Sequence, residues 1–371
     1  MYRLVQRRGI IGLFCLLFVA SSVVPGWAQK DNRFEVSKNL DIFNSLLKEV
    51  EMFYVDSVDV DKTVQRGIEA MLAGLDPYTE YYPEQKTEEL SLMTTGEYGG
   101  IGSLIRQRNN EGGVMIAEPT EGMPADLAGL KPGDLILAID TIDVSKATNS
   151  RVSELLKGVP NTKMVLTIQR PGEKKPRKFE ITRKQITTPQ VTYYGVKNDS
   201  IGYIYLKAFT IKSAQEVKEA FLDLKKNHNI KSLVLDLRGN GGGVLEGAVQ
   251  IVGMFVPKGS EVLSTKGKIK QWDRTYRTST EPLDTVMPLA ILINGGTASA
   301  AEIVSGSLQD MDRAVLVGQR SFGKGLVQAP RDLPYNGKVK ITMSKYYIPS
   351  GRCIQQIDYS HRKEDGSVAA I

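Results

Sequence analysis

Hydrophobic positions repeat with two different periods along the chain. At 34–54 and 63–75 apolar side chains recur every three or four residues, which is the spacing of an amphipathic helix. From about residue 96 the pattern changes to short apolar runs between glycine-rich turns, which predicts strands. Helical patterns at 150–156 and 213–226 separate groups of these strands. The alternation of strands and helices in the second half predicts an α/β core.

The composition is that of a globular protein, since 41% of the residues are hydrophobic and 24% are charged. A chain of 371 residues exceeds one typical core and predicts two or three domains. The net charge is +6, but the basic residues are dispersed and often stand beside acidic ones. We therefore expect no nucleic-acid partner.

Residues 1–28 have the pattern of a secretory signal peptide. Three arginines precede an apolar run at 9–20, and Gly26-Trp27-Ala28 places small residues at the expected cleavage positions. The run is too short to span a bilayer comfortably. Cleavage after Ala28 would release a soluble exported protein, which we expect in the periplasm. An uncleaved membrane anchor is the alternative.

The chain has two cysteines and two histidines. Cys15 would leave with the signal peptide, so the mature protein would keep only Cys353 and would have no disulfide framework. A lone thiol in an exported protein is more often inert packing than a catalytic group. The same short inventory argues against structural zinc, and we expect neither a metal nor another cofactor.

A candidate nucleophile lies at a predicted strand-to-helix turn. Leu289–Ile293 predicts a buried strand, and the Asn-Gly-Gly sequence that follows ends it. Thr297 can cap a helix whose first turn is 298–301, and Glu302 near its start suits the helix dipole. Ser299 therefore stands among residues small enough to admit a substrate backbone, although the Gly-x-Ser-x-Gly elbow is missing.

A serine hydroxyl needs a base, and the base here is predicted to be a lysine. His228 lies in the polar end of a predicted helix and His361 lies in a charged tail, so neither is placed like a catalytic histidine. Lys324 stands between two glycines in a small apolar loop, where burial can lower its pKa. Gln328, four residues later, carries an amide that can hold the uncharged amine.

Three motifs occur together in this part of the chain. They are DLRGNGGG at Asp236–Gly243, TASAAE around Ser299, and SFGKGLVQ carrying Lys324 and Gln328. In these motifs and their spacing the chain resembles the C-terminal processing, or tail-specific, serine peptidases, which use a Ser-Lys dyad assisted by Gln. The resemblance extends from about residue 40 to residue 357.

Each motif taken singly has an ordinary explanation. A serine at a helix start is usually just a small residue compatible with the helix, and a Gly-Lys-Gly loop is usually a solvated turn. A single glutamine is nearly always a surface residue. Only the joint occurrence of the motifs favours the catalytic interpretation of Ser299, Lys324 and Gln328.

The resemblance implies an α/β (α+β) architecture: a crotonase/ClpP-like protease core with an inserted PDZ domain. The expected segments are a signal peptide at 1–28, an N-terminal helical segment at 29–95, a PDZ domain at 96–185, and a peptidase core at 186–371 with parts of 76–95.

In the family the N-terminal helical segment often joins subunits, which implies a homo-oligomer. The alternative is that this segment packs onto the core of its own subunit. Members of the family commonly continue with another core segment after the position that corresponds to residue 371. The peptidase core is therefore expected to be either truncated here or different at its end.

The expected PDZ domain carries a candidate site for a peptide C-terminus. Gly100-Ile101-Gly102 stands where the family has the loop whose backbone N–H groups receive a terminal carboxylate, and the peptide would add as a strand to the sheet edge. The family often has an arginine before the glycine that follows the PDZ helix, where it can sense bound peptide. Here Lys157 precedes Gly158, which keeps the charge but loses the bidentate geometry.

The glycine run after Asp236 predicts part of an oxyanion hole. Dinucleotide binding is rejected because the chain has no G-x-G-x-x-G fingerprint there. By resemblance, Gly241 or Gly242 supplies one backbone donor and Ala300 the second.

These observations together predict an exported serine endopeptidase that recognises the C-terminal tails of its protein substrates. Ser299 would attack the scissile carbonyl, Lys324 would take its proton, and Gln328 would orient Lys324. A catalytically silent, PDZ-based tail-binding adaptor is the first alternative, against which the intact Ser, Lys and Gln positions argue. An acyl-CoA enzyme on a crotonase-like core is the second, and the signal peptide and PDZ segment disfavour it.

Overall fold

The computed structural model describes residues 33–108, 112–363 and 366–371. The predicted signal peptide at 1–28, including Cys15, lies outside this part of the chain. The described residues divide into two units, with the boundary between Arg66 and Gly67. Among the described helices, none combines the length and the apolar character needed to cross a membrane.

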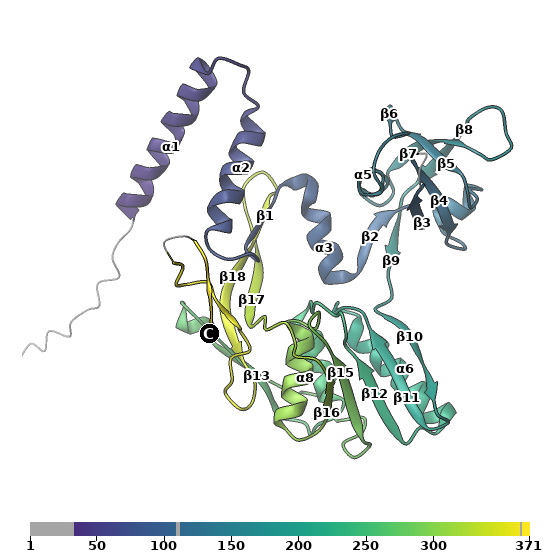
Figure 1. Ribbon diagram of the computed structural model, residues 1–371, viewed down its shortest axis with the longest axis vertical. Coiled ribbons are helices and arrows are strands. Elements are labelled where there is room, and N and C mark those ends of the chain that lie inside the picture. The colour runs from purple at the N-terminus through teal and green to yellow at the C-terminus, as the bar shows by residue number, and fades with distance from the viewer. Residues whose placement is uncertain (1–32, 109–111, 364–365) are drawn as a thin grey trace, which may run out of the picture. The chain divides into compact units, whose positions relative to one another are not determined.

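The two predicted N-terminal helices are confirmed as α1 (Arg33–Phe53) and α2 (Val60–Ala73) (Figure 1). No residue of α1 is buried, and large apolar side chains such as Phe34 and Leu40 are 72% and 62% exposed. The amphipathic pattern of α1 therefore leaves an apolar surface open to solvent.

A short segment then leads to the next glycine-rich region. It consists of β1 (Glu80–Tyr82), a 3₁₀ turn at Glu84–Lys86 and α3 (Thr87–Thr95). β1 pairs antiparallel with the distant strand β18 (Lys338–Tyr347). Residues from the 76–95 stretch are thus part of a sheet of the C-terminal half.

The segment expected to be a PDZ domain has its own sheet and its own core. Its strands are β3 (Ser103–Gln107), β4 (Val114–Pro119), β5 (Leu135–Ile139), β7 (Lys163–Gln169) and β8 (Arg177–Thr182) in spatial order, with β6 (Ile142–Asp143) added to β5. Two helices accompany the sheet, α4 (Pro124–Leu127) and α5 (Asn149–Leu156), and the Thr148 side chain caps α5. Inward-facing side chains such as Ile116, Ile136 and Leu166 are fully buried, so this region has a separate hydrophobic core.

The chain enters and leaves this region through two paired strands, β2 (Glu97–Gly100) and β9 (Lys184–Thr187). Glycine-rich turns were expected from about residue 96 onward, but the glycine-rich stretch Glu97–Gly100 is itself a strand. The turn comes at Gly102, whose φ of 66° favours glycine.

The C-terminal half contains the expected α/β sheet. Its strands, in spatial order, are β10 (Val191–Lys197), β11 (Ile201–Leu206), β12 (Ser232–Asp236), β15 (Leu289–Ile293) and β16 (Val315–Gly318). β10 is antiparallel to β11, and the remaining neighbours are parallel. Parallel neighbours require crossover connections, which here contain the helices α6 (Ser213–His228), α7 (Leu245–Gly253) and α8 (Ala300–Asp310).

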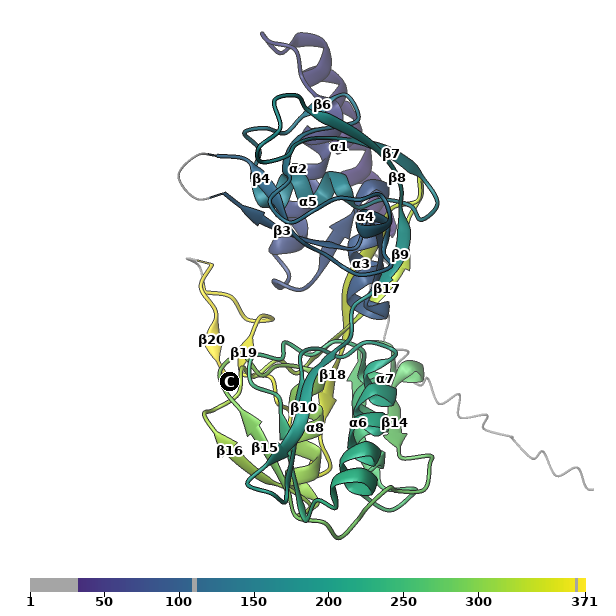
Figure 2. The same cartoon turned by 90° about the vertical axis from the view of Figure 1, so that its right-hand side faces the viewer.

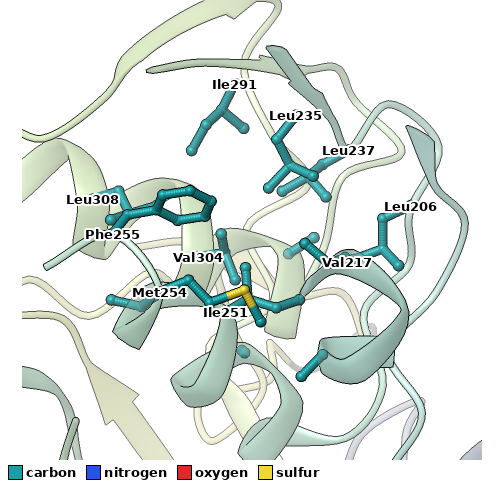
Figure 3. Packing of buried hydrophobic residues seen from close by; sticks show 14 of the residues in the cluster. Leu206, Val217, Leu235, Leu237, Ile251, Met254, Phe255, Ile291, Val304 and Leu308 are labelled. Carbon is teal, nitrogen blue, oxygen red and sulfur yellow. The ribbon is translucent and has the colours of Figure 1, made fainter. Parts of the chain in front are cut away.

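The three helices bury one face of this sheet. α6 and α7 pack side by side, and α7 packs against α8 (Figure 2). Leu235 and Ile291 from the strands meet Val217, Ile251 and Val304 from the helices (Figure 3). Because all five side chains are fully buried, this core is a firm base for the loops at the carboxyl ends of β12 and β15.

A second sheet completes this half of the chain. It contains β1, β18, β13 (Glu261–Gly267) and β14 (Arg274–Arg277), with β17 (Leu326–Asp332) also paired to β18. A 3₁₀ turn at Lys270–Trp272 joins β13 to β14. The tail forms a small pair, β19 (Ile357–Asp358) and β20 (Ala369–Ala370).

Candidate active site

Ser299 lies between the end of β15 and the first residue of α8. Its backbone has φ 55° and ψ −117°, a conformation that is costly for a residue with a side chain. Thr297 was predicted to cap the helix, and this was wrong: α8 begins at Ala300, with Ser299 at its N-cap position. The Thr297 hydroxyl instead donates to the Leu237 carbonyl (2.8 Å), which ties the β15 turn to the neighbouring loop.

The backbone of Ser299 and the backbone of Lys324 meet at one buried carboxylate. Glu302 is 1% exposed, and its Oε2 accepts hydrogen bonds from Ser299 N (2.8 Å) and Lys324 N (2.9 Å). Its Oε1 accepts from Gly323 N and from the Ser321 hydroxyl, both at 2.7 Å. Burial raises the pKa of this carboxyl, and these hydrogen bonds oppose the shift. Glu302 thus holds the serine turn to the lysine loop.

Sequence reasoning missed this role of Glu302. Its place near the start of α8 had indicated only a favourable interaction with the helix dipole. The capping-box pattern, in which a residue three positions into the helix bonds back to the N-cap N–H, was a signal that could have found the contact with Ser299. The bonds to residues 321–324 depend on the fold and leave no local pattern.

Lys324 lies in the loop that precedes β17. Burial lowers the pKa of its ammonium, the charge of Lys340 lowers it further, and the acidic groups of Glu80, Asp76 and Glu302 oppose the shift. The Lys324 Nζ lies 4.3 Å from the centroid of the Tyr78 ring. Lys324 is therefore a partly desolvated amine held against an aromatic face.

Gln328 was expected to hold the amine of Lys324. In the structure it lies on β17, and its Nε2 donates to the Thr342 hydroxyl on β18 (3.1 Å). Thr342 is in turn 3.3 Å from the Thr79 hydroxyl, which donates to Asp76. The amide nitrogen of Gln328 is therefore engaged by the sheet, and its side-chain oxygen remains the group that could accept from Lys324.

The glycine run after β12 passes directly beside the serine. A methyl group on Gly242 would lie 2.7 Å from the Cβ of Ser299, so the close approach requires glycine. The N–H of Gly242 donates to the buried Asn240 side chain (2.9 Å), whereas a methyl group on Gly241 would meet open space. Asn240 also accepts from Ala298 N through its backbone carbonyl (2.9 Å), which joins this loop to the serine turn.

The start of the same loop is fixed by an ion pair. Asp236 is 1% exposed and accepts from Arg238 Nη2 (2.6 Å) and from the Tyr203 hydroxyl. These donors hold the pKa of Asp236 below its usual value, against the effect of burial. The Asn294 side chain then accepts from Gly239 N (2.9 Å), so the ends of β12 and β15 are connected.

Both histidines lie at the surface. His361 is 86% exposed and pairs with Asp358 (2.6 Å), and His228 is 51% exposed and lies 3.9 Å from Asp223. Their nearest charged partners are thus surface carboxylates, and neither is part of the contacts around Ser299 described above.

The predicted carboxylate-binding loop occupies the turn between β2 and β3. Ile101 is 3% exposed, and its carbonyl accepts from Ala125 N at the start of α4 (2.8 Å). Lys157 ends α5, and its Nζ lies 5.4 Å from the centroid of the Tyr98 ring on β2. Gly158 N donates to Gly99 O (3.1 Å). The structure therefore brings Lys157 next to the strand that carries Gly100.

No group of three or more His, Cys, Asp and Glu side chains in the described residues is arranged to hold a metal ion. Cys353 is half-buried and has a free thiol.

Comparison with known proteins decides the family. The model of "Peptidase family S41" matches residues 200–360, and that of "PDZ domain" matches residues 115–170. A "Carboxy-terminal-processing protease" from Bartonella bacilliformis is 36% identical over 345 residues, which are 92% of this chain and 77% of that protein. The chain belongs to peptidase family S41, the carboxy-terminal-processing proteases.

Other similar proteins have related descriptions. A "Probable CtpA-like serine protease" from Staphylococcus aureus (strain COL) is 33% identical over 320 residues, covering 85% of this chain and 62% of that one. The solved photosystem II D1 C-terminal processing protease is 29% identical, covers 85% of this chain and 89% of that one, and has a TM-score of 0.47. This member of peptidase family S41 is therefore a serine peptidase with a PDZ domain. The α/β fold class predicted from the sequence is confirmed.

Proposed function

We propose that this S41 peptidase is an exported endopeptidase that selects proteins by their C-terminal tails and hydrolyses them with Ser299 and Lys324. The observation that carries the proposal is the shared anchor of the two residues: the buried Glu302 accepts an N–H bond from each. The two residues lie far apart in the sequence but are fixed to one carboxylate, on a core that packs tightly. A nucleophile and its base need such a fixed relation.

The proton transfers follow from the environment of Lys324. Burial favours its neutral amine, whose lone pair accepts the Ser299 proton as the hydroxyl oxygen attacks the scissile carbonyl. The resulting ammonium returns the proton to the leaving amine, which departs as the C–N bond breaks. Lys324, neutral again, then takes a proton from water as the water oxygen attacks the acyl-enzyme carbonyl. The ammonium returns this proton to the Ser299 oxygen as the ester C–O bond breaks, which frees the serine and the neutral amine.

The oxyanion would be stabilised at the start of α8. Ala300 is its first residue, so its N–H is at the positive end of the helix dipole. Gly241 is the proposed second donor, because the Gly242 N–H already donates to Asn240. Gly242, the next residue, approaches Ser299 closely, which supports a role for this glycine run beside the serine.

Gln328 is proposed to orient the amine through its side-chain oxygen. Its nitrogen donates to Thr342, which leaves the oxygen to accept one N–H of neutral Lys324. That bond would direct the lysine lone pair toward Ser299. Gln328 would then affect the rate less than Lys324, since it takes no proton.

Selection of substrates is assigned to the PDZ domain. The Gly100-Ile101-Gly102 loop would receive the terminal carboxylate through its backbone N–H groups, and the tail would pair as an added strand. Lys157, held beside β2, would add a positive charge near the carboxylate. Export through the signal at 1–28 and assembly through α1 remain part of the proposal, the latter because the apolar side chains of α1 are exposed.

The test is cleavage of an unfolded protein that carries an apolar C-terminal tag. The parent enzyme should cleave it, and Ser299→Ala should bind the tag without cleaving it. Binding by both proteins with cleavage by neither would instead support a PDZ-based adaptor. Cleavage by Ser299→Ala at the parental rate would refute the assignment of the nucleophile.

A further inference from the structure

A buried tyrosine hydroxyl lies between the two proposed catalytic residues. Tyr346, near the end of β18, is 1% exposed, and its hydroxyl lies within hydrogen-bond distance of the Lys324 carbonyl and of the Ser299 carbonyl (3.1 Å), which share its single proton. Burial raises the pKa of this phenol well above its usual value, so the hydroxyl keeps its proton at neutral pH. It is therefore a permanent donor that faces two acceptors.

The contacts of Tyr346 complement those of Glu302. The glutamate accepts from the N–H groups of Ser299 and Lys324, and the tyrosine donates to the carbonyl groups of the same two residues. The Ser299 carbonyl is also bonded within α8, to Glu302 N (2.8 Å) and Ile303 N (2.9 Å). The tyrosine hydroxyl thus links the lysine loop to a carbonyl that the helix already holds in place.

Removal of the Tyr346 hydroxyl would turn the attraction that links the Ser299 and Lys324 carbonyls into a repulsion. A phenylalanine would leave the two carbonyl oxygens converging on a point without a donor, where their dipoles repel. The Ser299 carbonyl would keep its bonds within α8, but the Lys324 carbonyl would lose the donor that Tyr346 supplies. The helix holds the Ser299 carbonyl, so the lysine loop is the part free to move. The Lys324 amine would then shift relative to the Ser299 hydroxyl.

We propose that Tyr346 is a positioning residue that sets the spacing between Ser299 and Lys324. This inference rests on the proposed Ser-Lys function, because the spacing matters only if a proton passes between the two side chains. Proton transfer requires hydrogen-bond distance, and a displacement of about 1 Å can cost about 100-fold in rate. In the proposed function the tail binds at the Gly100–Gly102 loop, so a substitution of Tyr346 should leave tail binding unchanged.

The experiment compares Tyr346→Phe with Tyr347→Phe in the full chain. Tyr347 is the matched control, since it neighbours Tyr346 on β18 but its ring packs under Lys266 (Nζ 4.9 Å from the centroid). Cleavage of the tagged unfolded protein gives kcat and KM, and a pH series gives the inflection of the rate. We expect Tyr346→Phe to lower kcat by about 10- to 100-fold with KM nearly unchanged, and to move the inflection to higher pH as Lys324 becomes more solvated.

A donor placed at the same point should restore the rate. 4-Aminophenylalanine at position 346 keeps the ring and offers N–H groups to both carbonyls, so its kcat should return to within a few-fold of the parent. Failure of this substitution to rescue would contradict the proposal, as would a Tyr346→Phe variant with parental kcat and pH profile. Loss of folded structure in Tyr346→Phe, seen by circular dichroism, would show that the hydroxyl maintains the fold and would also overturn it.

A different result is expected if Ser299 and Lys324 are not the catalytic residues. In that case Ser299→Ala and Lys324→Ala, measured in the same assay, would cleave like the parent. If both abolish cleavage while Tyr346→Phe behaves like Tyr347→Phe, the dyad stands and only the role of Tyr346 is refuted.

Discussion

Replacement of Glu302 by glutamine tests how the active site is held together. The carboxylate accepts four hydrogen bonds, from Ser299 N, Lys324 N, Gly323 N and the Ser321 hydroxyl. An amide has only one oxygen, so its NH₂ group must replace one of the two acceptors. In the better orientation the oxygen keeps Ser299 N and Lys324 N, the Ser321 hydroxyl turns to accept, and Gly323 N loses its partner.

The expected loss of stability is moderate. A buried N–H without a partner costs about 1–3 kcal/mol. Part of this cost is offset, because burial raises the Glu302 pKa and the ionised group is therefore itself unfavourable in the folded state at neutral pH. We expect a net loss of about 1–2 kcal/mol, which lowers the thermal midpoint by about 2–4 °C per kcal/mol. The lysine loop, now bound at fewer points, should reduce kcat by about 10- to 100-fold.

The pH dependence of stability adds a second signature. A carboxyl whose folded-state pKa is raised binds its proton more tightly in the folded state than in the unfolded state. Its contribution to stability is therefore present at low pH and is lost as pH rises from the ordinary value of 4.5 through the raised value. Glutamine does not titrate, so the free energy of unfolding of the parent should fall relative to that of Glu302→Gln across this window.

Glu216→Gln is the matched control for both measurements. Glu216 on α6 also accepts two backbone N–H bonds, from Gln190 (2.6 Å) and Val191 (2.8 Å), and neither partner belongs to the serine turn or the lysine loop. Both bonds go to the same oxygen, Oε2, so the amide oxygen of Glu216→Gln can keep them. Urea unfolding should therefore show little loss of stability for this variant, and its kcat should match the parent. Parental kcat and stability in Glu302→Gln, or an equal loss of kcat in Glu216→Gln, would refute the reasoning.

Three further outcomes are expected. Lys324→Ala and Lys324→Arg should both abolish cleavage while peptide binding is retained, because neither side chain offers a neutral amine. Gln328→Ala should slow cleavage less than either lysine variant. Turnover by either lysine variant would count against the dyad. A substrate with a free C-terminal carboxylate over an apolar residue should be cleaved faster than its amidated form, and equal rates would mean that the Gly100–Gly102 loop does not bind the terminus. Removal of α1 should lower the oligomeric state measured by light scattering, whereas an unchanged mass would place the subunit contact elsewhere.

Local patterns in the sequence predicted the elements of the core well. The apolar run Leu289–Ile293 is strand β15 with the same bounds, and the helix expected at 213–226 is α6, Ser213–His228. Both elements can be predicted because the spacing of their hydrophobic residues, and the residues that begin or end a helix or strand, lie within a few positions of each other. The same holds for α5, expected at 150–156 and observed at Asn149–Leu156.

The arrangement around Ser299 was only partly accessible from the sequence. Its positive φ was missed because the Gly-x-Ser-x-Gly pattern that signals such a turn is missing, and this led to the wrong cap at Thr297. Tyr346 was missed because it meets the serine turn only through the tertiary fold, 47 positions along the chain from Ser299. Such contacts depend on tertiary packing, and no local period encodes them.

The most direct test of the Ser-Lys account is the pH dependence of kcat/KM. Lys324 acts as a base only when neutral, and its pKa is lowered by burial and by Lys340, so activity should rise as pH increases through that lowered pKa. The His228→Gln, His361→Gln double variant should give the same profile as the parent, because both side chains are exposed. A profile with an inflection near 6.5, the ordinary histidine pKa, that disappears in the double variant would contradict the assignment of Lys324 as the base.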